Sequence, residues 1–295
     1  MVSSFKFLIT GITSIHGWPV FEYFLSLYPG QVLGIKNEFA PRPLESACVV
    51  SANIEDRKKI HQICREFQPT HILHCAGLCD LDTAEDHPQR AYDLNIQGAW
   101  NIYEMASLCR LLYLSYDLIF SGIQNQGQGY TEEDIPDPLT IVGKTVYEAE
   151  KVLLRNENAL IIRLGLPMGP SIQGNKGAVD WINSRFKKNF RVTLLYDEIR
   201  STINTQDLGK AVHSLMIDGG RGILNLGSPY TISLHGIGKK ILEAHRYPSD
   251  ILEGKFRYEF PPSPPRMGNV SLNSQKAYSI LGWIPEPWNY PTSSF

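Results

Sequence analysis

Short apolar runs alternate with longer stretches of helical spacing through the first 163 residues. Residues 5–9 are an apolar run that Gly11 follows, and residues 18–27 repeat apolar side chains at helical intervals until Pro29. The same alternation predicts further strands at 32–35, 71–74, 111–115 and 159–163, and helices at 54–67, 88–109 and 143–155. Strands that alternate with helices pair in parallel, because each helix carries the chain back across the sheet. The pattern predicts an α/β fold with a doubly wound parallel sheet of the Rossmann type.

The regular alternation stops after residue 163. Glycine and proline become more frequent, and the run 261–265 contains four prolines, each of which fixes its own φ. We expect residues 1–163 to form the cofactor-binding sheet domain, with part of 204–227 returning to it. Residues 164–203 and 228–295 would form a smaller substrate-binding domain, the second wall of a crevice at the carboxyl ends of the strands.

A glycine-containing turn joins the first predicted strand to the first helix. Backbone N–H groups of such a turn bind the pyrophosphate of a dinucleotide, and glycine allows the close approach. The sequence therefore predicts that the cofactor is bound by Gly11, Thr13, Ser14, Ile15, His16 and Gly17. Ser14 replaces the middle glycine of the usual spacing, and its side chain would either crowd the pyrophosphate or donate a hydroxyl to it. For His16 we favour a surface or packing role over a catalytic one.

The end of the second predicted strand bears on the choice between NADP and NAD. An NAD enzyme usually has an acidic residue there, which binds the ribose hydroxyls. Here the strand ends at Lys36, and Arg42 is nearby, which favours the 2′-phosphate of NADP. Glu38 keeps NAD as the lesser alternative.

The composition excludes several classes of function. A net charge of −2 provides no basic excess for nucleic acid or an anionic membrane. Without an apolar segment of about 18 residues or a signal-peptide pattern, a cytoplasmic protein is expected. The five cysteines lack metal-ligand spacing, so we expect reduced, mostly buried thiols and no metal site.

Motifs along nearly the whole chain, taken in order, resemble one family. They are Asn53-Ile54 and the segments 68–77, 81–85, 95–101, 114–122, 161–165, 197–200, 207–208, 270–273 and 281–283. The chain resembles the extended short-chain dehydrogenase/reductases, and within them the dTDP-4-dehydrorhamnose reductases and the related regulatory β subunits of methionine adenosyltransferase. The resemblance implies an NAD(P) cofactor and a nucleotide-sugar substrate. It adds as cofactor-binding residues Asn53, Ile54, Cys75, Ala76, Gly77 and Asn95, and it places near the substrate Cys79, Asp80, Asp117 and Arg200.

The stretch 147–151, YEAEK, contains the Tyr-x-x-x-Lys spacing of a catalytic pair. In the reductases that this chain resembles, the catalytic helix reads Tyr-Gly-x-Thr-Lys-Leu-x-Gly-Glu. The glycine, threonine and glutamate positions are matched by Gly143, Thr145 and Glu150. In that register Val142 takes the tyrosine position and Val146 the lysine position, so both catalytic residues are missing.

A shift of five residues would be needed to make Tyr147 and Lys151 the catalytic pair. Such a shift turns a helix by about 140°, which would point Tyr147 away from the cleft. We therefore interpret both residues as part of a partly solvated helical face.

The family's hydroxyl residue after the fifth strand, a threonine or serine, falls on Tyr116. Reduction of a carbonyl needs a phenol that donates a proton, and a lysine that lowers the phenol's pKa from about 10. We hypothesise that Tyr116 replaces the lost tyrosine, with Lys144 or a cofactor ribose assisting. The alternative is that Tyr116 only fills the space beside Val142.

Three functions fit these observations. The first is a nucleotide-sugar reductase or epimerase with an altered acid, and the second is a silent NADP-binding regulatory subunit of a partner enzyme. The third is an enzyme of this fold whose chemistry needs no such acid. Arg200 could bind a diphosphate or form a surface or interdomain ion pair. A homodimer or a complex with a partner enzyme is compatible with each function.

Overall fold

The computed structural model describes residues 5–40, 46–125, 127–172, 174, 177–218, 220–261 and 263–290. Its centre is a sheet of seven strands: β1 (Phe7–Thr10), β2 (Val32–Lys36), β3 (Val49–Ser51), β4 (His71–His74), β5 (Arg110–Tyr116), β6 (Ala159–Leu164) and β10 (Gly222–Leu226). The spatial order is β10-β6-β5-β4-β1-β2-β3, and every neighbouring pair is parallel. The predicted doubly wound sheet is therefore confirmed. The strand order reverses between β1 and β4, where folds of this kind have their ligand crevice.

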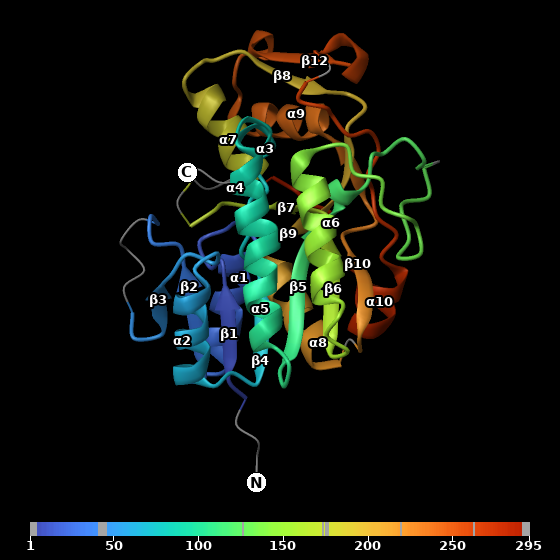
Figure 1. Ribbon diagram of the computed structural model, residues 1–295. Coiled ribbons are helices and arrows are strands. Elements are labelled where there is room, and N and C mark those ends of the chain that lie inside the picture. Colours follow the sequence, from blue (N-terminus) through green and yellow to red (C-terminus); the bar gives the residue numbers. More distant parts are fainter. Residues whose placement is uncertain are drawn as a thin grey trace.

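Helices cover both faces of the sheet (Figure 1). On one face lie α1 (Gly17–Leu27), α8 (Thr205–Asp218) and α10 (Gln275–Leu281); on the other lie α2 (Arg57–Phe67), α5 (Gly98–Met105) and α6 (Ile141–Leu153). Along β1, Phe7 and Ile9 belong to the first core and Leu8 to the second. This alternation follows from the two-residue period of a strand, and burial on both faces explains why the strands are continuous apolar runs.

A smaller region lies beyond the carboxyl ends of the strands, at the top of Figure 1. It contains a three-stranded sheet of β7 (Leu166–Met168), β9 (Ile199–Asn204) and β11 (Thr231–Ser233), and a two-stranded sheet of β8 (Val192–Leu195) and β12 (Leu252–Lys255). Its helices are α7 (Gly177–Lys187) and α9 (Leu234–His245), with 3₁₀ turns at Ser249–Ile251 and Arg257–Glu259. A separate core of Met168, Phe186, Ile237 and Trp288 holds these elements together.

Several boundaries differ from the sequence-based expectation. The helix expected at 88–109 consists of α4 (Pro88–Tyr92), a π-helical turn (Asp93–Gln97) and α5, and it ends at Met105. The short elements β3, α3 (Leu81–Asp86) and the 3₁₀ turn Asp117–Ile119 were not predicted.

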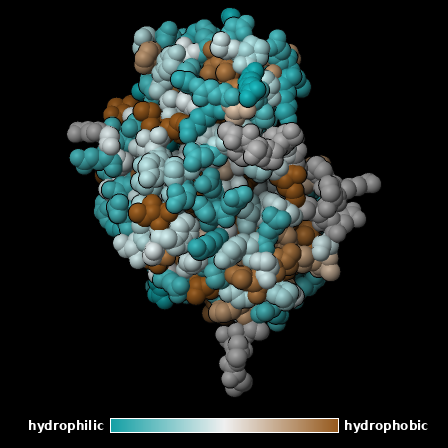
Figure 2. Space-filling model, turned by 180° about the vertical axis from the view of Figure 1, so that it is seen from behind, coloured by the Kyte–Doolittle hydropathy of each residue, from teal (hydrophilic) through white to brown (hydrophobic). Residues whose placement is uncertain are grey.

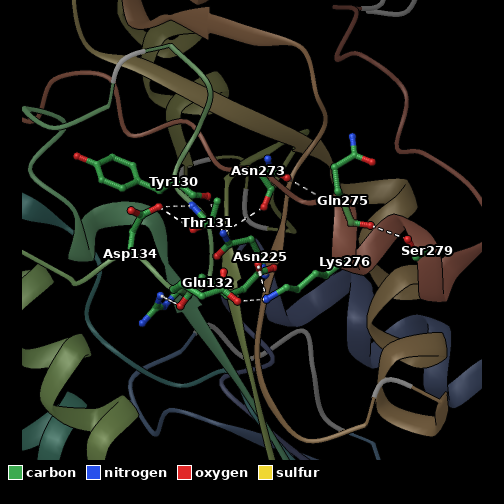
Figure 3. Close-up of polar contacts among 11 residues, drawn as sticks. Tyr130, Thr131, Glu132, Asp134, Asn225, Asn273, Gln275, Lys276 and Ser279 are labelled. Carbon is green, nitrogen blue, oxygen red and sulfur yellow. Dashed lines mark hydrogen bonds and ion pairs between the residues drawn. The ribbon is translucent and has the colours of Figure 1, made fainter.

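The C-terminal part of the chain returns to the sheet, although the sequence assigned all of 228–295 to the small domain. Ala277 of α10 is buried in the core beneath α8, and Asn273 and Lys276 lie beside β10 (Figure 3). Asn225 on β10 donates through Nδ2 to the carbonyls of Tyr130 (2.8 Å) and Asn273 (3.2 Å). Residues 275–283 therefore belong with the sheet, because their apolar side chains find a core only there.

A buried ion pair joins the sheet to the small region. Arg200 of β9 donates through Nε to Asp117 Oδ2 (2.7 Å) and through Nη2 to the other carboxylate oxygen. Its Nη1 lies 3.5 Å from Glu198. The side chains of Arg200 and Asp117 are 8% and 0% exposed, so their attraction is weakly screened.

The outer surface is mixed on the face turned away in Figure 1. Figure 2 shows hydrophobic residues there in small groups separated by hydrophilic ones. No helix in the described ranges is long and apolar enough to cross a membrane.

Replacement of Asp117 by asparagine should strongly destabilise the protein. It leaves the buried Arg200 guanidinium without its bidentate partner, which should lower the free energy of unfolding by about 3–5 kcal/mol. The matched control is Lys151→Ala, which removes an ion pair with Glu148 whose side chains are 49% and 52% exposed. That change should cost less than about 1 kcal/mol. Urea denaturation measures both, and equal losses would contradict the assigned role of the buried pair.

Candidate cofactor and substrate site

The turn between β1 and α1 lies directly against the end of β4. Gly11 has φ +66°, and a Cβ there would come within 2.6 Å of the Ala76 backbone. At Gly17, a Cβ would lie 2.2 Å from the Gly11 carbonyl oxygen. Both positions therefore require glycine, because a side chain at Gly11 would push the turn away from the end of β4 and one at Gly17 would force the turn itself open. Thr13 is half-buried on this turn, and Ile15 is buried against Gly177 at the start of α7.

Ser14 adopts neither of the two expected roles. Its hydroxyl donates to the Gly11 carbonyl (2.8 Å) and accepts from the Gly17 N–H (2.9 Å). The side chain closes the turn from within, so it neither crowds nor reaches out to a pyrophosphate.

His16 is buried, which agrees with a packing position and excludes a surface one. Its Nε2 lies 2.9 Å from the Cys75 carbonyl oxygen and 3.0 Å from the Tyr116 hydroxyl oxygen. Burial lowers the pKa of His16 to about 4, although the bond with Cys75 opposes this shift. The imidazole is therefore neutral at neutral pH.

The residues expected at the adenine and ribose end form a small polar network. Asn37 donates to Asn53 Oδ1 (3.1 Å), and Asn53 donates to Glu38 Oε2 (3.0 Å). Lys36 is buried at the end of β2, and Ile54 packs beneath Gly98 of α5. Arg42, the other residue that favoured NADP, lies outside the described residues.

The loop after β4 is fixed by two side chains. The backbone N–H groups of Cys75 and Ala76 donate to the Thr10 hydroxyl, each at 3.1 Å. Asn95, in the π-helical turn, accepts from the Leu78 N–H (2.7 Å) and donates to the Leu78 carbonyl (3.0 Å). Asn95 Nδ2 also donates to Thr145 of α6 (2.8 Å), so this loop is held rigidly to the helix that would carry the catalytic pair. Gly77, Cys79 and Asp80 are exposed. Cys75 is buried, and this burial raises the pKa of its thiol.

Val142 and Val146 are fully buried on the inner face of α6. They belong to one apolar cluster with Tyr116, Leu118, Phe120 and Met267. Lys151 is exposed, pairs with Glu148 (2.6 Å) and lies 4.2 Å from the centre of the Tyr147 ring. The structure thus places the YEAEK tyrosine at the margin of this cluster, with its lysine turned to solvent.

Tyr116 reaches from the end of β5 to His16, and the two rings meet edge to face with centroids 5.3 Å apart. Burial, followed by the Cys79 side chain, raises the pKa of the Tyr116 phenol well above its ordinary value. Lys144, the residue expected to assist Tyr116, is exposed on α6. Ser115 donates a hydrogen bond to the buried carboxylate of Glu150, which also forms an ion pair with Arg163 (3.0 Å). Tyr116 is thus the residue of this strand end that faces the glycine turn.

Three of the residues expected at the substrate have structural partners. Arg200 and Asp117 form the interdomain ion pair, so the guanidinium is not free to bind a diphosphate, and the ion-pair alternative is correct. Asp80 begins α3 and accepts from the Thr83 N–H (2.8 Å) while remaining exposed. Among the described residues, no group of His, Cys, Asp or Glu side chains is arranged to hold a metal ion.

The contact between His16 and Tyr116 could not be read from the sequence, because the two residues are 100 positions apart. The available signal was indirect. Tyr116 stands in place of the family's usual hydroxyl residue, and the structure brings it to a histidine of the glycine turn.

Comparison with known proteins shows the same architecture. The chain is 34% identical to the β subunit of bovine methionine adenosyltransferase 2 over 167 residues, 56% of this chain and 47% of that relative, so it spans about half of that relative's length. A UDP-glucose 4-epimerase from Thermotoga maritima, solved with UDP-glucose, matches with a TM-score of 0.83 at 19% identity over 95% of this chain and 94% of that one. A dTDP-4-dehydrorhamnose reductase from Bacillus anthracis, solved with NADP, matches with a TM-score of 0.75 at 21% identity over 96% and 95% of the two chains.

At these identities the solved structures establish the fold alone. The family itself is shown by the model of the RmlD substrate binding domain, which matches residues 6–295. The glycine turn, the seven-stranded sheet and this match together show that the chain belongs to the RmlD substrate binding domain family, within the extended short-chain dehydrogenase/reductases.

Proposed function

We propose that the protein binds NAD(P) and a nucleotide-sugar between the sheet and the small region, and reduces a keto group of the sugar without a Tyr-x-x-x-Lys pair. The observation that carries the proposal is the Tyr116 hydroxyl, held by His16 beside the two buried valines of α6. The NADP-bound reductase and the UDP-glucose-bound epimerase of the same fold support the two ligand classes.

The residues present fit a dinucleotide. Gly11 and Gly17 occupy positions that a Cβ would fill, and the Ser14 hydroxyl is turned into the turn rather than outward. The backbone of the turn can therefore be approached by a pyrophosphate at the start of α1. A bound nicotinamide would supply the hydride, and the protein's own residues would orient the sugar and supply the proton.

The electrostatics of Tyr116 favour reduction over epimerisation. Reduction needs a neutral phenol that donates a proton, whereas epimerisation through a transient ketone begins with removal of a proton from an alcohol. Burial raises the pKa of Tyr116, and Val146 stands where a lysine would counteract that effect. Such a phenol keeps its proton at rest, which is the state from which reduction begins, although the same shift makes it a weak acid.

The second candidate function is a catalytically silent regulatory subunit. It is favoured by the apolar burial of Val142 and Val146, which places no polar group at these two positions, and by the relatedness to the methionine adenosyltransferase β subunit. This function would keep cofactor binding, lose turnover, and require a stable complex with a methionine adenosyltransferase catalytic subunit.

We expect a preference for NADP over NAD that depends on Lys36. A charge-assisted contact with the 2′-phosphate is worth about 1.5–3 kcal/mol, so Lys36→Ala should weaken NADP binding at least about tenfold and leave NAD affinity almost unchanged. Lys58→Ala, an exposed lysine on α2, is the control and should alter neither affinity. Calorimetric titration measures both cofactors. Equal weakening of NADP and NAD, or tighter NAD binding by the unaltered protein, would reject the assignment.

Turnover should depend on Tyr116 and not on Tyr147. With NADPH and a panel of nucleotide 4-ketosugars, Tyr116→Phe should lower kcat by about 10²-fold or more, because it removes the proton donor. Tyr147→Phe is the matched control and should retain full turnover. The reverse pattern would restore YEAEK as the catalytic pair. Normal cofactor binding without any NADPH consumption, together with co-purification of a methionine adenosyltransferase, would favour the regulatory function.

A further inference from the structure

One ring nitrogen of His16 faces two oxygen atoms. Nε2 lies within hydrogen-bonding distance of the Cys75 carbonyl oxygen (2.9 Å) and of the Tyr116 hydroxyl oxygen (3.0 Å). All three residues are less than 9% exposed, so water competes little for these contacts. The geometry therefore restricts where the protons of the imidazole and the phenol can be.

The contact with the Cys75 carbonyl determines which tautomer His16 adopts. A carbonyl oxygen only accepts hydrogen bonds, so its contact with Nε2 requires that this nitrogen carries a proton. A protonated ring nitrogen has no free lone pair, and the Tyr116 hydroxyl cannot donate to it. The phenol oxygen is then the acceptor of the pair, sharing the N–H with the Cys75 carbonyl, and the phenol proton must point elsewhere.

The other described polar neighbour of the phenol is Cys79. This residue lies on the exposed loop that follows β4, and its side chain forms a hydrogen bond with Tyr116 that contributes to the raised pKa, after burial. Val142 and Val146, which pack in the same cluster as the phenol ring, offer no acceptor. Cys79 therefore offers the phenol proton an acceptor on the loop 77–80, which is the exposed side of the site.

We propose that His16 is a positioning residue whose Nε2–H fixes Tyr116 as a hydrogen-bond donor directed at the loop 77–80. The imidazole thereby takes over the orienting part of the work that the missing lysine does in related sites. That a sugar carbonyl receives this proton rests on the function proposed above; the tautomer and the orientation of the phenol do not.

The groups that face this pair fix its charge state. His16 comes from the turn before α1, Cys75 and Cys79 from the segment after β4, and Tyr113 from the strand that also carries Tyr116. Burial lowers the pKa of His16 to about 4 and raises that of Tyr113 and Cys75, so these three groups are neutral at neutral pH. A neutral imidazole N–H and a neutral phenol are the states that the proposed arrangement requires.

Nuclear magnetic resonance of the ligand-free protein tests the inference without reference to activity. With ¹⁵N-histidine, His16 should show a neutral Nε2–H form from pH 7 down to pH ~5, about a unit above its pKa, and its signals should shift in Tyr116→Phe. With ¹³Cζ-tyrosine, the Tyr116 signal should be preserved in His16→Gln, whose amide can still donate, and should shift or broaden in His16→Leu, which has no donor. An Nδ1–H or doubly protonated ring, or an equal Tyr116 signal in both variants, would overturn the proposal.

Turnover of the same variants separates positioning from the proposed function. His16→Gln should stay within about threefold of the unaltered protein, whereas His16→Leu should lose about tenfold to a hundredfold in kcat with KM for NADPH unchanged. If His16→Leu turned over as fast as the unaltered protein, the positioning role would be wrong. If no form consumed NADPH while the resonance results held, the reductase function alone would fail.

Discussion

The close approach of the glycine turn to the end of β4 is the constraint on which the rest of the site depends. With Gly11 in its left-handed conformation against Ala76, the start of α1 lies over the carboxyl ends of the central strands. This approach brings His16 to the Cys75 carbonyl and, through it, to Tyr116. The Thr10 hydroxyl accepts hydrogen bonds from the backbone N–H groups of Cys75 and Ala76, so β1, β4 and the turn form one rigid unit. A Cβ at Gly11 would move this unit apart and separate all of these contacts.

In the proposed register, the replacement of the catalytic pair by Val142 and Val146 and the presence of Tyr116 form a single change in packing. A lysine at position 146 would need a partner for its charge, because Val146 lies among Ile119, Phe120 and Met267 with no exposed surface. Two valines remove this requirement. The Tyr116 ring packs in the same apolar cluster and places its hydroxyl 3.0 Å from His16 Nε2. Tyr116 therefore belongs both to the apolar cluster and to the polar contact with His16 at the edge of that cluster.

Sequence reasoning succeeded where local pattern decides structure. The run 71–74 and the apolar side chains of 159–163 predicted β4 and most of β6, and the register of Gly143, Thr145 and Glu150 agrees with α6, in which these residues face inward. It failed where a side chain chooses between distant partners. Arg200 finds Asp117 83 positions earlier in the chain, a choice that its neighbouring residues do not encode. The Ser14 hydroxyl is a different case, because its partners Gly11 and Gly17 are three positions away and the sequence left its direction open. The π-helical turn at Asn95 was missed for a reason similar to that for Arg200, because Asn95 makes hydrogen bonds to Leu78 and Thr145, which are far from it in the sequence.

Whether the protein acts as an enzyme or as a silent subunit depends on the free-energy cost of forming a phenolate in a buried site. In a site with a lysine, the cation stabilises the phenolate that remains after proton donation, and the same group then serves as a base in the reverse direction. Here, among the described residues, the hydrogen bond that could stabilise a phenolate comes from the neutral N–H of His16, which is shared with the Cys75 carbonyl. A single neutral hydrogen bond is worth about 0.5–1.5 kcal/mol, whereas lowering a phenol from a pKa near 10 to neutrality needs about 4 kcal/mol. The arrangement therefore keeps the phenol protonated and oriented, but proton donation would leave a phenolate supported by only this hydrogen bond, so the proposed reduction should be slower than in a site with a lysine.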